Sequence, residues 1–169
     1  MNASMKNISF GTIPSWLRAI IAGGLVAGAF DITFAIIVWG SRGATPIQIG
    51  QAIASGLVGR EAAAAGGVSL GIFGLVLHFV MTTLMAAVYY MLAKRIPMLV
   101  KHAFAFGIAY GLAIYLTMNY VVVPLSARGA STGSAPLAII VSEVLVHMFG
   151  VGLTIALFTR RALRHCAQR

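Results

Sequence analysis

Four long runs of apolar residues limit this chain to one kind of structure. A helix needs about 20 such residues to cross a hydrocarbon layer of about 30 Å, and each run is that long. Aromatic residues such as Trp39 and Tyr90 stand near run ends, as in the aromatic belts of membrane proteins. The sequence therefore predicts four transmembrane helices, at about residues 19–40, 70–93, 103–123 and 137–158.

The composition agrees with a chain whose solvent is lipid. Of 169 residues, 60% are hydrophobic and only 9% are charged, whereas a water-soluble domain carries roughly 25% charged residues. The first run is too long for the core of a signal peptide and contains Asp31, so we expect it to be retained. We predict a single all-α integral membrane domain, residues 1–169, that forms a four-helix transmembrane bundle in the lipid bilayer.

The basic residues predict the orientation of the bundle. Twelve Lys and Arg stand against three acidic residues, for a net charge of +9. They flank the apolar runs instead of forming a stripe with aromatic residues, which argues against nucleic acid as a partner. Nine lie before the first run, between the second and third, or after the fourth; only Arg42, Arg60 and Arg128 lie on the opposite side. The positive-inside rule then places both termini in the cytoplasm. Because the compact, linker-free chain looks bacterial, we expect a multi-pass protein of the bacterial inner (plasma) membrane.

The first external loop contains the signature of a short amphipathic helix. Thr45 and Pro46 have the residue types of an N-cap and a first helical position. Ile49, Ile53 and Leu57 then recur at every fourth residue among polar and small neighbours. Such a helix lies on the outer face or packs over the mouth of the bundle. It serves either as a plain connector or as a lid over a cavity.

Polar side chains within the predicted spans are the strongest functional signal. An ionisable group at mid-membrane costs a few kcal/mol even on the gentlest scale, so it should face a partner inside the bundle. At about 1.5 Å per residue, five polar residues, four of them ionisable, fall in one slab roughly 10 Å thick, in the outer half of the membrane. They form the predicted intramembrane polar cluster: Asp31, His78, Asn119, Glu143 and His147.

The neighbours of these residues indicate which way they face. Gly24 and Gly28 share a helical stripe with Asp31, and small residues at this spacing let helices approach closely. Glu143 and His147 are four residues apart, so their side chains can meet on one helix face. Polar bonds between helices are often only structural, and for Asn119 that is the simpler interpretation. Two carboxylates and two imidazoles at one depth exceed what such a structural role requires.

Three functions are compatible with the cluster. The first is a small proton-linked transporter or permease-type protein, which we expect to be a homo-oligomer because four helices make a narrow bundle. The second is a metal- or haem-binding membrane protein with His78 and His147 as ligands, since the second and fourth spans lie diagonally in an up-down bundle. The third is a structural or accessory subunit. Because the sequence has no phosphate-binding loop, nucleophile elbow or paired cysteines, we predict no enzyme, no catalytic residues and no particular substrate or cofactor.

Several segments together carry a resemblance to a known group. They are residues 24–31 (GLVAGAFD), 51–57 (QAIASGL), 77–79 (LHF), 88–90 (VYY) and 118–127 (MNYVVVPLSA). With them the chain resembles a family of small, uncharacterised bacterial inner-membrane proteins with four spans. It is more remotely similar to the YagU-like inner-membrane proteins, which are also small and helical and have an intramembrane histidine. The resemblance implies the four-span topology and no particular activity.

Overall fold

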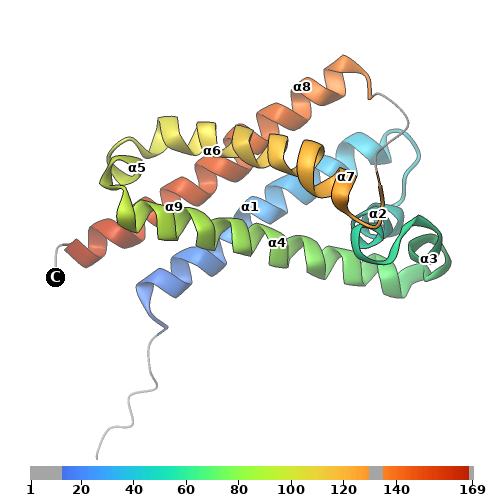
Figure 1. Cartoon of the computed structure of the whole chain (residues 1–169), viewed down its shortest axis with the longest axis horizontal. Helices are drawn as coiled ribbons and strands as arrows, with labels where there is room; N and C mark the ends of the chain where they lie inside the picture. The colour runs from blue at the N-terminus through green and yellow to red at the C-terminus, as the bar shows by residue number, and fades with distance from the viewer. Residues whose placement is uncertain (1–12, 130–134, 168–169) are drawn as a thin grey trace, which may run out of the picture.

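The structure, a computed structural model, describes residues 13–129 and 135–167, and this part of the chain is helical without strands. Four helices in it are long and apolar enough to cross a membrane (Figure 1). This confirms the predicted all-α fold with four spans, and each predicted span lies within an observed one. The observed spans are Ser15–Gly40, Gly67–Arg95, Ala103–Leu125 and Leu137–Arg164.

Two spans are continuous α-helices and two contain π-helical segments, which the sequence did not predict. The continuous ones are α1 (Ser15–Gly40) and α4 (Gly67–Arg95). Short helices occupy the connections: α2 (Pro46–Val58), α3 (Arg60–Ala65) and α5 (Pro97–Lys101). The third span consists of α6 (Ala103–Thr117), π-helix η1 (Met118–Val122) and α7 (Val123–Leu125); the fourth consists of α8 (Leu137–Leu145), π-helix η2 (Val146–Gly152) and α9 (Leu153–Ala167).

The third span continues past Pro124, beyond its predicted end at about residue 123. Helical structure continues to Leu125, and Pro124 lies in the first turn of α7, directly after the η1 segment. A proline inside a helix removes a backbone donor and crowds the preceding turn. The π-helical turn of η1 changes the spacing of the backbone hydrogen bonds just before Pro124. The third span therefore continues through the proline and ends one residue later, at Leu125.

Glycine stripes set how closely the spans pack. α1 packs against α4 on one side and against η2 and α9 on the other, while α6 packs against η2 and α9. A Cβ on Gly24 would lie 2.5 Å from the Cα of Thr83, and one on Gly28 would lie 2.7 Å from the Oγ1 of Thr82. On the other side of the bundle, Gly111 leaves no room for a Cβ because the main chain of the fourth span lies directly against it. The small residues thus bring α1 close to α4, and α6 close to η2.

The predicted amphipathic helix is α2, and its capping signal is confirmed. The hydroxyl of Thr45 accepts a hydrogen bond from the Gln48 N–H (3.3 Å), while the Gln48 side chain accepts one from the Thr45 N–H (2.8 Å). Of the predicted apolar face, Ile49 is buried, whereas Leu57 is 61% exposed. α2 crosses α4 where Gly50 and Gly74 meet backbone to backbone.

This crossing gives a first testable prediction. Gly74→Ala should lower the unfolding free energy by about 1–3 kcal/mol, because its Cβ would collide with the main chain of Gly50, which cannot rotate away. Gly40→Ala is the matched control, since a Cβ there meets nothing within 4 Å. Denaturant unfolding of the two variants in detergent measures the difference. Equal unfolding free energies for both variants would show that α2 does not pack on α4 this tightly.

Candidate intramembrane polar site

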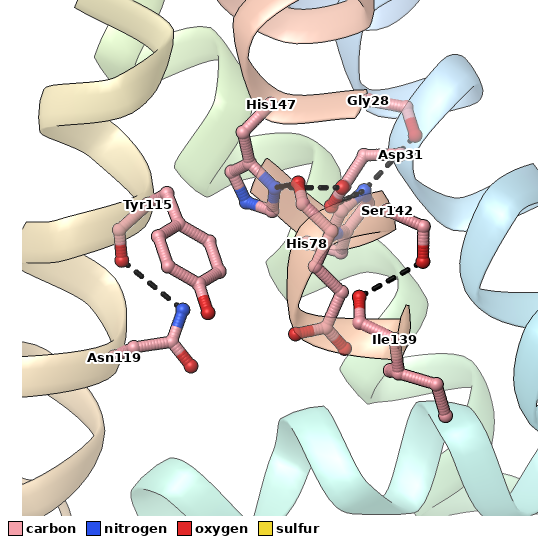
Figure 2. A network of polar contacts seen from close by, with 9 residues as sticks. Gly28, Asp31, His78, Tyr115, Asn119, Ile139, Ser142 and His147 are labelled. Carbon is pink, nitrogen blue, oxygen red and sulfur yellow. Dashed lines mark hydrogen bonds and ion pairs between the residues drawn. The ribbon is translucent and has the colours of Figure 1, made fainter. Parts of the chain in front are cut away.

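Asp31 lies at the centre of a group of polar side chains in the middle of the bundle (Figure 2). Its Oδ2 is 3.9 Å from the Nε2 of His78, and its Oδ1 is 3.8 Å from the Nδ1 of His147. These separations permit electrostatic attraction but exceed a direct hydrogen bond. All three side chains are largely buried, with exposed fractions of 23% for Asp31, 11% for His78 and 16% for His147. One carboxylate therefore faces two imidazoles from two other spans.

His78 is oriented by the backbone of α1. Its Nε2 lies 3.0 Å from the carbonyl oxygen of Gly28. A carbonyl can only accept, so Nε2 carries the hydrogen and donates it. The bond forms because the Gly28 stripe brings α1 close to α4, and the neighbouring Phe79 ring packs edge-on to the imidazole at 5.4 Å. The same N–H thus points toward a backbone carbonyl and toward the Asp31 carboxylate.

His147 has a matching arrangement on the fourth span. Its Nδ1 lies 2.8 Å from the carbonyl oxygen of Glu143, so Nδ1 is the protonated nitrogen. His147 belongs to the π-helical segment η2, and its main chain rests against Gly111 of α6. The Tyr115 ring packs edge-on against the imidazole, with centroids 5.4 Å apart (Figure 2). Close packing against α6 therefore fixes the ring that faces Asp31.

The other two predicted residues join the group less directly. Glu143 contributes its backbone carbonyl to His147, and its carboxylate is near enough to Asp31 and His147 to interact electrostatically. Asn119 donates to the Tyr115 carbonyl on its own helix at 3.1 Å (Figure 2). The structure thus brings together Asp31, His78 and His147, while Asn119 reaches them only through Tyr115.

The tautomers define what the site can do chemically. With a hydrogen on Nε2 of His78 and on Nδ1 of His147, each imidazole donates from the side that faces Asp31. In a neutral imidazole the opposite ring nitrogen is an acceptor that can bind a proton, and a carboxylate can also bind one. The site therefore has three groups that bind protons within one layer.

The geometry does not favour the metal or haem interpretation. Within the described ranges, no three His, Cys, Asp or Glu side chains are grouped so that they could hold a metal ion. A porphyrin bound by two axial histidines needs the space between the imidazoles, and here the Asp31 carboxylate lies between them. Among the described residues, no buried side-chain nitrogen or oxygen lacks a hydrogen-bond partner. His78 and His147 are thus arranged around a carboxylate instead of a cofactor.

The fold and the site define a multi-pass membrane protein with a carboxylate–imidazole cluster inside its helical bundle. Comparisons with protein-family models, with curated proteins and with solved structures gave no match to this chain. The resemblance to small bacterial four-span proteins therefore stays a prediction, and function must be argued from the site.

Proposed function

We propose that this protein is a small proton-linked transporter of the bacterial inner membrane, in which Asp31 is the group that takes up and releases the proton. The observation that carries the proposal is the Asp31 carboxylate lying between the imidazoles of His78 and His147 within the spans. Burying ionisable groups in a membrane is costly, and such groups mark proton relays in pumps and transporters. The intramembrane polar cluster includes two of the three acidic residues of the chain, Asp31 and Glu143.

The contacts of the imidazoles support a site with two bonding states. When Asp31 is charged, it attracts the N–H groups of both histidines; when it is protonated, that attraction is lost and each N–H stays with its backbone carbonyl. The carbonyl distances of 3.0 Å and 2.8 Å show that these partners are already in reach. Protonation of one side chain on α1 would therefore change how α1 is held by two other spans. Proton-linked transport requires such a coupling between protonation and helix packing.

The π-helical segments support the same proposal. Single-turn π-helices inside α-helices occur frequently at functional sites. One of them, η2, contains His147, and the other, η1, contains Asn119. Both segments lie in spans that pack beside the site. A helix that rearranges must exchange some of its backbone hydrogen bonds, and a π-helical segment is a place where the bonding pattern already changes. A homo-oligomer would supply further helices around the narrow bundle and belongs to the proposal.

The proposal is tested with purified protein in liposomes that contain a pH-sensitive dye. Small solutes of different charge are added outside one at a time, and proton entry or exit is recorded with and without protein. We expect one class of solute to drive proton movement that needs the protein. If no solute class moves protons, and acidification leaves the protonation of the site unchanged, the polar layer is structural and the accessory-subunit interpretation applies.

The orientation of the bundle is a separate prediction from the nine-to-three distribution of Lys and Arg. A reporter fused after Arg169, or inserted between Lys94 and His102, should report the cytoplasm. A reporter inserted near Gly129 should report the outside. A phosphatase that is active only outside and a fluorescent protein that folds only inside give opposite signals at each position. An externally active C-terminal fusion would reverse the predicted orientation.

A further inference from the structure

The packing around the Asp31 site differs between the two ends of the bundle. The α2 end holds α2 and α3, and the opposite, terminal end holds α5 and the last turns of α9 (Figure 1). One helical turn from the site toward the terminal end, three spans each have a buried residue: Ala27 is 0% exposed, Thr82 3% and Val151 2%. Ala27 and Val151 belong to one apolar core with Ile155. This packing closes the site toward the terminal end.

One turn from the site toward the α2 end, two spans have polar and less buried residues instead. Glu143 lies one turn before His147 on the fourth span and is half-buried. Asn119 lies one turn after Tyr115 on the third span and is exposed. Both Tyr115 and Asn119 point from the third span toward the site (Figure 2). The polar layer therefore continues toward the α2 end.

The spans are also more loosely packed beyond this layer on the α2 side. α1 has no buried residue after Ile32, η1 and α7 have none, and α8 has only Ile139. The first half of α4 is different, because α2 covers it where Gly50 and Gly74 meet. The site is thus least enclosed between the first, third and fourth spans, on the side where Glu143 lies.

The Glu143 carboxylate is placed to exchange protons with the site. It is near enough to Asp31 on α1 and to His147 on its own span to interact with both electrostatically. It is also near enough to the Tyr115 hydroxyl on α6 to interact with it. Two carboxylates in one site repel each other when both are charged, and a proton bound to either one removes that repulsion.

We propose that Glu143 is the group through which protons reach Asp31 from the α2 end, the end that the distribution of Lys and Arg predicts to be outside. Glu143 binds a proton from water and becomes a neutral carboxylic acid. The proton then passes to the Asp31 carboxylate, through water or the His147 side chain, and Glu143 regains its charge. The inference deepens the proposed function and rests on Asp31 as its proton-binding group.

The first test follows the protonation of Asp31 in time and needs no transported solute. Purified protein in liposomes receives a pulse of protons released by light, and the carboxylic-acid infrared band that Asp31→Asn lacks is recorded. Glu143→Gln should slow the rise of this band at least about tenfold, because a positioned proton-transfer group is lost. Its final height should stay the same, since Asp31 is unchanged. Ser142→Ala is the matched control and should keep the wild-type rate, because its hydroxyl bonds to the Ile139 carbonyl of its own helix at 2.8 Å.

The outcomes separate this inference from the proposed function. If wild-type protein never gives an Asp31 band on acidification, the proposed function fails and the entry role fails with it. If the band rises in Glu143→Gln as fast as in wild type, the proposed function stands and only the entry role of Glu143 is overturned.

The second test asks whether water reaches the α2 side of the site, and it changes neither carboxylate. In a Cys166→Ser background, single cysteines replace Asn119, Val121 and Val151, and a charged methanethiosulfonate reagent is added. Asn119→Cys should react at least about tenfold faster than the other two, because only a thiolate in contact with water reacts. Val121 is exposed and apolar on the other side of the same helix, and Val151 is buried on the terminal side. If Asn119→Cys reacts no faster than Val121→Cys, the proposed entry route is overturned.

Discussion

Asp31→Asn should reduce solute-driven proton movement by about 100-fold or more, the effect expected when a positioned proton-transfer group is removed. Asn has nearly the same shape and can still accept a hydrogen bond from an imidazole, but it cannot take up the proton. The carboxylate faces both His78 and His147, so its charge is the one that links α1 to two other spans. The measurement is proton entry into dye-loaded liposomes, at equal amounts of folded protein.

The controls separate a proton-binding role from a structural one. Glu61→Gln removes the one acidic residue that lies outside the spans, on α3, and should leave proton movement as in wild type. Asp31→Glu keeps a carboxylate and should restore part of the activity. Infrared difference spectra between neutral and acidic buffer should contain a carboxylic-acid band that Asp31→Asn lacks. If Asp31→Asn folds and moves protons as wild type does, Asp31 does not carry the proton.

Much of the fold follows from local sequence patterns. The four spans were predictable because an apolar run of membrane length has few alternative structures. The start of α2 was equally visible, because Thr45 and Pro46 have strong preferences at the start of a helix. The π-helical segments were not visible, since no residue type marks a shift of one residue in backbone hydrogen bonding.

The candidate site was predictable in its residues but not in its contacts. The cost of burying charge identifies Asp31 and the two histidines. Their partners include two backbone carbonyls, and no side-chain pattern marks either one. The Gly28 carbonyl reaches His78 through the packing of α1 on α4, and the Glu143 carbonyl lies one turn before His147 on the same span. The same limit hid the contact between α3 and the segment after α7. The Nε of Arg60 bonds a carbonyl 68 residues away in the sequence, and only the folded chain brings them together.

Gly111→Val should lower the unfolding free energy by about 3 kcal/mol or more, at the upper end of the range for overpacking. The new side chain would collide with the carbonyl of His147 and lie against the Cα of Met148. Both obstacles are main chain, so neither can move without shifting η2 away from α6. Because η2 carries His147, the shift would also separate the imidazole from Asp31.

Two comparisons make this prediction specific. Ala109→Val adds two methyl groups on the same helix at an exposed position, and should change the unfolding free energy by less than about 0.5 kcal/mol. Gly111→Ala is a milder change and should keep the bundle folded while it moves His147, so proton movement should fall more than stability does. Denaturant unfolding in detergent and the liposome assay measure the two quantities on the same samples. Unchanged unfolding and proton movement in both Gly111 variants would show that the contact between α6 and η2 does not position the site.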